Sequence, residues 1–217
     1  MGKNRLPELA KTQLSDLLNQ PGCILYSSHK TLKPGDIYLM GFNPGGAGGK
    51  PLSHHIDGML DYDKNAYIDE SWSNLKGESK KGASPLQKRV CWIIQSLGYN
   101  PKDVCASNLI FFQSRAAVDI DYSLAETCWP VHEAIIDIVQ PKIILTFGNS
   151  AISPYGYLKS VYGGEEDVAP SGHGNWMIKG FKTKINGRPV YVAGLPHLSR
   201  YSPIGKEDVT HWISGKF

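Results

Sequence analysis

Cysteine is scarce in this sequence, and its few cysteines show no pairing pattern. Among 217 residues there are four cysteines, and no two of them form a Cys-x-x-Cys pair. Such wide spacing argues against a disulfide framework and against a metal-binding cluster, and it favours reduced, mostly buried thiols. We therefore expect no metal and no cofactor. The four are Cys23, Cys91, Cys105 and Cys128.

Long apolar runs are also missing. No stretch approaches the ~20 apolar residues that a membrane-spanning helix needs. The segment after Met1 is polar and amphipathic, unlike the apolar centre of a signal peptide. We expect a cytoplasmic protein without membrane contact, a monomer built as one domain over residues 1–217. A net charge of +3 is compatible with a nucleic-acid partner but does not require one.

Four segments have the composition of buried strands, and segments of helical periodicity separate them. The strand candidates lie at 37–41, 106–112, 142–147 and 188–193. This alternation predicts an α/β protein, a three-layer α/β/α fold around a central, mostly parallel four-stranded sheet. Asn186-Gly187 predicts a hairpin that joins a strand at 181–185 to the last of the four. Segments 47–83 and 154–174 are expected to be mostly loop.

The first strand candidate ends in a tight, glycine-rich turn with one polar residue at its tip. Gly41 and Gly45 allow close approach of a ligand, while Pro44 restricts Asn43 to extended conformations. Ligands of open α/β sheets bind at the carboxyl ends of the strands. A glycine-rich turn on its own is also compatible with phosphate binding.

Two further strand candidates carry a polar side chain at or near their ends, so three residues are candidates for one crevice: Asn43, Asn108 and His197. The set contains no acyl-transfer triad, no Walker lysine and no pair of carboxylates. It offers neutral donors and acceptors and a histidine, which suit a planar polar ring and a developing anion. The alternatives are a turn asparagine that bonds its own backbone, a buried structural amide and a surface histidine.

Three motifs resemble those of the uracil-DNA glycosylase superfamily. Gly41-Phe42-Asn43-Pro44-Gly45 is similar to the first motif of its mismatch-specific and single-strand-selective monofunctional branches. The segment 197–200 is similar to a variant of the His-Pro-Ser second motif, with Leu198 in place of proline. The segment 141–151 is similar to the third-strand signature. Segment 46–67 departs from the family pattern, because its pocket phenylalanine is not recognisable there.

The resemblance implies a role for each strand-end residue. Asn43 would position the water that attacks the sugar, and His197 would donate a hydrogen bond to O2 of the departing base. Asn108 would read the Watson–Crick edge of the base. The other substrate-binding candidates are the turn residues Gly41, Pro44 and Gly45 and the stacking aromatics Phe42, Tyr62 and Tyr67, with Trp72 a further aromatic candidate.

DNA contacts are expected beside the histidine and in a basic cluster. Ser199, Arg200 and Tyr201 follow His197, and Arg200 or Tyr201 would fill the space that a flipped nucleotide leaves. The basic cluster surrounds the start of a predicted helix at 84–98 and contains Lys76, Lys80, Lys81, Lys88 and Arg89. Its alternative is a solvated charged face.

These expectations combine into one preferred function and two alternatives. The preferred function is a monofunctional DNA glycosylase of base excision repair, whose partner is DNA that contains uracil or another deaminated base. Monofunctional chemistry is expected because no strand-end lysine is placed to form a Schiff base. The first alternative is a catalytically inactive glycosylase-like domain that binds nucleic acid or a free base. The second is an unrelated α/β enzyme that binds a phosphate at the glycine-rich turn.

Overall fold

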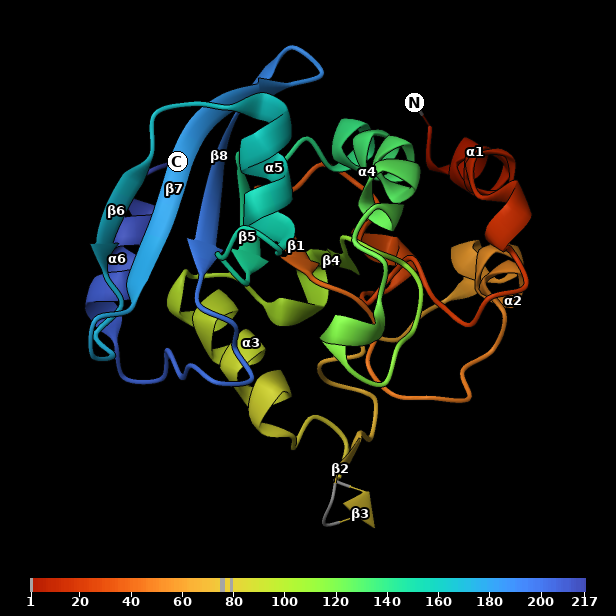
Figure 1. Ribbon diagram of the computed structural model, residues 1–217, viewed down its shortest axis with the longest axis horizontal. Helices are drawn as coiled ribbons and strands as arrows, with labels where there is room; N and C mark the ends of the chain where they lie inside the picture. Colours follow the sequence, from red (N-terminus) through yellow and green to blue (C-terminus); the bar gives the residue numbers. More distant parts are fainter. Residues whose placement is uncertain (1, 75–76, 79) are drawn as a thin grey trace.

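The computed structural model describes residues 2–74, 77–78 and 80–217, which form an α/β structure around one large sheet (Figure 1). The sheet has six strands in the order β4-β1-β5-β8-β7-β6. Its first four strands are parallel to one another, β7 pairs antiparallel with β8, and the edge strand β6 pairs antiparallel with β7. In chain order these strands are β1 (Ile37–Gly41), β4 (Cys105–Asn108), β5 (Ile143–Phe147), β6 (Asp167–Pro170), β7 (Met177–Ile185) and β8 (Arg188–Leu195).

The expected sheet of four strands is therefore corrected to six strands of mixed direction. The four predicted core strands are present as the parallel part of the sheet, but the one predicted at 106–112 ends at Asn108. The two additional strands extend it beyond β8, and β6 is an edge strand of only four residues ending in Pro170. A short edge strand with a proline gives a weak sequence signal, because proline is typical of turns and of sheet edges alike.

Helices cover both faces of the sheet. The described residues form six α-helices and the two-stranded ribbon β2 (Ser73–Asn74) and β3 (Gly77–Glu78). The helices are α1 (Leu6–Gln13), α2 (Leu52–Asp57), α3 (Pro85–Ser96), α4 (Leu124–Val139), α5 (Pro154–Tyr162) and α6 (Glu207–Ser214). Short 3-10 helices lie at Lys3–Arg5, Ser15–Leu17, His29–Thr31, Met59–Asp61, Pro101–Asp103 and Ala117–Asp119.

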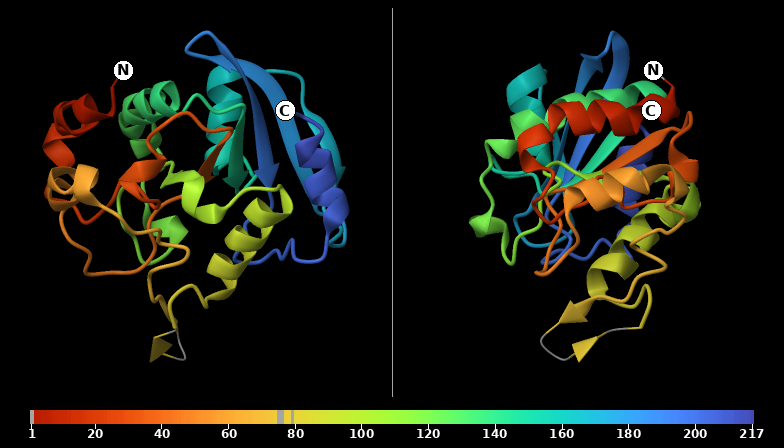
Figure 2. Two further views of the ribbon diagram at one scale, coloured as in Figure 1. Left: turned by 180° about the vertical axis from the view of Figure 1, so that it is seen from behind. Right: turned by 90° about the vertical axis from the view of Figure 1, so that its right-hand side faces the viewer.

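The alternation of side chains along β1 explains the three layers. Tyr38 and Met40 point into a core that also contains residues of α1, α4 and α5. Ile37 and Leu39 point into a second core, on the other face, with residues of α3 and α6. Successive strand residues face opposite sides, so a strand that is apolar throughout requires a helical layer on each side. Figure 2 shows these helices on both sides of the sheet.

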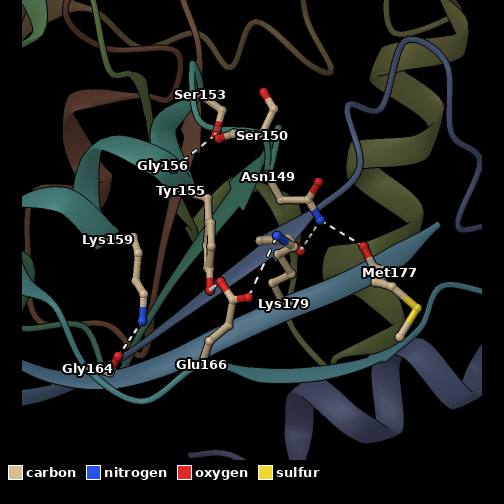
Figure 3. Close-up of polar contacts among 11 residues, drawn as sticks. Asn149, Ser150, Ser153, Tyr155, Gly156, Lys159, Gly164, Glu166, Met177 and Lys179 are labelled. Carbon is tan, nitrogen blue, oxygen red and sulfur yellow. Dashed lines mark hydrogen bonds and ion pairs between the residues drawn. The ribbon is translucent and has the colours of Figure 1, made fainter.

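Two segments were expected to be mostly loop. The prediction is wrong for 154–174, most of which is helix or strand, whereas the described part of 47–83 is mostly loop but contains the helix α2. Within 47–83, α2 buries Leu52 and Ile56, which are spaced for one helical face. Within 154–174, α5 begins at Pro154, and the Ser153 hydroxyl oxygen accepts a hydrogen bond from the Gly156 amide at 3.0 Å (Figure 3). Serine followed by proline is a recognisable start of a helix.

Two local predictions are confirmed. The hairpin between β7 and β8 turns at Asn186 and Gly187, whose φ angles of 51° and 77° lie in the left-handed region that an Asn-Gly turn adopts. The helix expected after Ser84 is α3, and the Ser84 hydroxyl accepts the Gln87 amide at 3.2 Å. In the part of the chain that the structure describes, no helix has the length and apolar character needed to cross a membrane.

Candidate functional site

A cavity of about 1070 Å³ opens where the parallel strands end, and it brings the three strand-end candidates together. Asn43, Asn108 and His197 all line it. Asn108 ends β4, Asn43 follows β1, and His197 follows β8, so three separate strands supply them. The carboxyl ends of parallel strands lie at one edge of a sheet, which is why residues distant in sequence meet there.

The Asn43 side chain is fixed through its amide nitrogen. Nδ2 donates to the carbonyl oxygens of Pro44 at 3.0 Å and Phe112 at 3.3 Å, and to the Ser114 hydroxyl oxygen at 2.8 Å. Carbonyl oxygens only accept hydrogen bonds, so the nitrogen must face them and the orientation of the amide is determined. None of the described residues donates to Oδ1, which leaves this acceptor available to a ligand.

Asn108 presents the opposite situation, a buried donor without a partner. The residue is 3% exposed, and its Nδ2 makes no hydrogen bond of good geometry among the described residues, although the Tyr26 side chain lies near this amide. An unpaired buried amide costs free energy, about 1–3 kcal/mol, unless a bound ligand or a water satisfies it. Because Asn108 lines the cavity, an acceptor atom of a ligand there is a suitable partner.

His197 is held in one neutral tautomer. The Ser199 backbone amide donates to its Nδ1 at 3.2 Å, and the Ser199 hydroxyl oxygen lies 2.7 Å from the same atom. Nδ1 is therefore an acceptor, so the proton is on Nε2, which is left to donate to a ligand. Loss of hydration and, secondarily, the Arg200 charge lower the pKa of His197, which favours this neutral form although the ring is open to the cavity.

A residue of α3 anchors the turn that carries His197. The Arg89 guanidinium donates to the carbonyl oxygens of Leu198 at 2.6 Å and Ser199 at 3.0 Å. Sequence analysis placed Arg89 in a basic cluster beside DNA. The structure instead shows a contact 109 residues away along the chain, which no local pattern reveals.

Aromatic side chains and one carboxylate form another wall of the cavity. Phe42, Tyr62, Tyr67 and Trp72 all line it, as expected for stacking candidates, and Tyr26 joins them. Glu70 also lines the cavity, and its two carboxylate oxygens accept hydrogen bonds from Tyr62 at 3.0 Å and Trp72 at 3.2 Å. No sequence pattern predicted a role for Glu70. The one sequence feature that could have indicated a functional role for Glu70 is its position between Tyr67 and Trp72, in a segment rich in glycine and polar residues.

Burial keeps three tyrosines, a cysteine and a histidine of the cavity neutral. It raises the pKa of Tyr26, Tyr62 and Tyr67, with the Glu70 carboxylate adding to the effect. It also raises the pKa of the Cys23 thiol to about 12, so this cysteine is not a thiolate nucleophile at neutral pH. Burial lowers the pKa of His55 to about 4. The two hydrogen-bond donors to Glu70, the Tyr62 hydroxyl and the Trp72 indole, are thus both uncharged.

The remaining candidates of the glycine-rich turn and of the DNA contact lie in the cavity, behind it or in a neighbouring groove. Pro44, Gly45 and Ser199 line the cavity. Gly41 lies behind it, where a Cβ would come within 2.2 Å of the Asn108 Oδ1, so this glycine makes room for the amide. Arg200 is exposed and lines a neighbouring groove.

Tyr201, Lys80 and Lys81, like Arg200, do not line this cavity. Tyr201 is fully buried and donates to the Ser171 carbonyl oxygen at 2.7 Å, so its expected role as a wedge in DNA is corrected to a role in packing. Lys80 and Lys81 are exposed in the segment before α3, and neither lines the cavity. Lys76 lies outside the described residues.

Comparison with known proteins gives no match, either to protein-family models or to curated proteins. Among the residues that the structure describes, no three His, Cys, Asp or Glu side chains gather as a metal ion would require.

Proposed function

We propose that this protein is a DNA glycosylase of the uracil type, which hydrolyses the N-glycosidic bond of uracil or a related deaminated base flipped out of DNA. One observation carries the proposal: Asn43, Asn108 and His197 line a single cavity and offer it an acceptor, an unpaired buried donor and an Nε2–H donor. The three-layer α/β/α arrangement around a sheet with parallel central strands is compatible with a glycosylase of this superfamily.

The proposed reaction needs little nucleophilic assistance. As the bond between C1′ and the base breaks, its electron pair leaves with the base and the sugar becomes cation-like. Asn43 Oδ1 accepts a hydrogen bond from a water, whose oxygen then bonds to C1′ while its proton passes to solvent. An amide is too weak a base to deprotonate water before attack, so Asn43 contributes by position. The fixed orientation of its Nδ2 supports this role.

The base is recognised at its polar edges. Asn108 Nδ2 donates to O4 of uracil while Oδ1 accepts from N3–H, a pairing that satisfies the orphan donor. His197 Nε2–H donates to O2, where negative charge accumulates as the base departs. Phe42, Tyr62 and Tyr67 are the candidates for stacking on its face.

The lining of the cavity also favours monofunctional chemistry. Of the described residues that line it, Lys50 is the one lysine, and its Nζ lies 2.8 Å from His54 Nε2. This lysine lies just before α2, at the far end of the segment that follows β1, and so is not at a strand end. We therefore assign hydrolysis to water and no Schiff-base step to the protein.

The test is release of bases from oligonucleotides, detected by alkaline cleavage at abasic sites. Single strands and G·U duplexes carry uracil, and further single strands carry hypoxanthine or xanthine. We expect release by the wild type and a loss of about 100-fold or more in Asn43→Ala, the loss typical of a key catalytic hydrogen bond. Asn4→Ala, at an exposed asparagine outside the cavity, is the control. No release from any of these substrates would refute the enzymatic proposal.

The same panel tests the inactive-domain alternative. Leu198, where the related motif has proline, is the observation that favours it. Salt-dependent DNA binding that survives Asn43→Ala, without base release by the wild type, would support a binding domain.

A further inference from the structure

A second hollow of about 460 Å³ lies beside the candidate active site. His197 lines both, so the two hollows meet at the turn that carries this residue. The new groove is formed by the segments that follow β5 and β8 and by the start of β7. The proposed glycosylase reaction uses no residue of this groove except His197.

Sheet topology explains why the start of β7 reaches this place. β7 runs antiparallel to β8, and Lys179 pairs with Gly194 near the end of β8. The loop 171–176 between β6 and β7 therefore lies at the same edge of the sheet as Asn43 and His197. Along that edge β4 and β1, whose ends carry Asn108 and Asn43, lie on one side of β5 and β8, and β7 lies on the other.

The groove presents a large aromatic side chain to solvent. Trp176 is 40% exposed and its neighbour Met177 is 36% exposed. The loop is closed by a hydrogen bond from the Ser171 amide to the Trp176 carbonyl oxygen at 2.9 Å, and the ring centroid of His173 lies 4.9 Å from that of Trp176. The indole is thus held by an ordered loop, and its exposure leaves a planar apolar surface available.

A neutral side chain, Asn149, fixes the floor of the groove. The charged residues that line the groove are positive. Asn149 Nδ2 donates to the carbonyl oxygens of Met177 at 2.8 Å and Gly194 at 3.1 Å, which ties β7 to the end of β8 (Figure 3). Of the residues that line the groove, two are cationic, Lys179 and Arg200, and none is acidic. Lys179 lies 3.7 Å from Glu166, whereas no ion pair of Arg200 occurs among the described residues.

We propose that this groove binds the nucleobase of an unpaired nucleotide next to the one that enters the cavity. Trp176 stacks on that base, and Arg200 contacts the phosphate between the two nucleotides. An aromatic platform beside a free cation is the combination that binds single-stranded nucleic acid. The occupant is a neighbouring nucleotide of the same strand because the groove and the cavity share His197. The placement rests on the proposed glycosylase function.

The test measures binding to DNA that contains no damaged base. Fluorescence anisotropy gives the dissociation constants of a labelled 12-nucleotide oligothymidine and of a matched duplex. We expect Trp176→Ala to bind the single strand roughly 5- to 150-fold more weakly, the factor to which one base–aromatic stack corresponds, and to bind the duplex within twofold of wild type. Trp176→Phe should restore most of the affinity. Val161→Ala, which changes an exposed apolar residue on α5, is the matched control.

A second measurement addresses the phosphate contact. Arg200→Gln should reduce the slope of log affinity against log salt for the single strand by about 0.7, the value for one phosphate contact. Equal single-strand affinity in Trp176→Ala and wild type, or an equal loss on the duplex, would overturn the inference. Normal base release together with either result refutes this groove alone. Tryptophan-dependent binding without release of any base refutes the glycosylase proposal and leaves the groove a single-strand site.

Discussion

The amide nitrogen of Asn43 lies 2.8 Å from the hydroxyl oxygen of Ser114, which in turn donates to the Ala116 carbonyl oxygen at 2.8 Å. Ser114 also donates its backbone amide to the Pro44 carbonyl oxygen at 3.1 Å. The segment after β4 thus holds the turn after β1 from the side. Ser114 is therefore a positioning residue for Asn43, because its hydroxyl group bonds Asn43 and the Ala116 carbonyl oxygen and is assigned no contact with the reacting atoms.

Ser114→Ala should therefore weaken catalysis less than Asn43→Ala does. Loss of one neutral hydrogen bond corresponds to about 0.5–1.5 kcal/mol, or roughly 2- to 13-fold in rate. We expect the loss in kcat with KM nearly unchanged, and Ser114→Thr should restore most of it. Single-turnover rates on a uracil oligonucleotide check this. A loss as large as that of Asn43→Ala would mean that Ser114 takes part in the chemistry.

Gly41→Ala should disturb the recognition of the base. Its Cβ would come within 2.2 Å of the Asn108 Oδ1 and 2.7 Å of the Phe147 Cζ, so the amide must move. Displacement of a positioned group by about 1 Å typically costs on the order of 100-fold in kcat/KM. Gly35→Ala, whose Cβ would have its nearest contact at 3.9 Å, is the control. Unchanged kcat/KM in a folded Gly41→Ala would argue against a role for Asn108.

Arg200→Gln should shift the pH dependence of base release. The Arg200 charge contributes to the lowered pKa of His197, so its removal raises that pKa toward the ordinary 6.5. Protonation would place a proton on Nδ1, facing the Ser199 amide, and so disrupt the turn. Release by the wild type should remain constant as pH falls through 6.5 and decline only below it. The decline should begin at a higher pH in the variant, and identical profiles would contradict this.

Glu70→Ala should affect binding more than the chemical step. The carboxylate accepts hydrogen bonds from Tyr62 and Trp72, and hydrogen bonds to a charged group contribute about 1.5–3 kcal/mol each. Without it, the aromatic wall is less well fixed, and we expect KM to rise about tenfold. Glu70→Gln, which retains one acceptor oxygen, should lie between. A fall in kcat at constant KM would instead indicate that Glu70 acts on the reacting atoms.

Sequence patterns predicted the three strand-end residues of the candidate site but not the residues that hold the walls of the site in place. Asn43, Asn108 and His197 were recognisable because each ends or follows an apolar strand, and strand ends of a parallel sheet meet. Arg89, Ser114 and Glu70 act through contacts whose partners depend on the tertiary structure. Their residue types carry no local signal for those contacts. The signal that predicted α3, serine followed by proline, was also present before α5 and was outweighed there by the glycines that follow.

The last prediction concerns stability, through a buried network behind Asn108. His132 is fully buried, with Nε2 2.9 Å from the Leu109 carbonyl oxygen and Nδ1 2.8 Å from the Tyr38 hydroxyl oxygen. A carbonyl only accepts, so Nε2 carries the proton and Nδ1 accepts from Tyr38. Burial lowers the pKa of His132 from 6.5 to about 4 in the folded state. The unfolded chain therefore binds a proton first as pH falls.

This contribution to the free energy of unfolding is complete above pH 6.5 and is lost progressively down to about pH 4. Between pH 7 and pH 5, His132 alone should lower that free energy by about 2 kcal/mol. Urea unfolding at both pH values measures the difference. Glutamine at this position can donate to Leu109 and accept from Tyr38 but does not titrate, so His132→Gln should reduce the pH difference by about the same 2 kcal/mol. If His132→Gln still unfolds cooperatively and shows the same difference in the free energy of unfolding between pH 7 and pH 5 as the wild type, other groups cause the acid sensitivity. The reason is that glutamine preserves both hydrogen bonds and differs from histidine in not titrating.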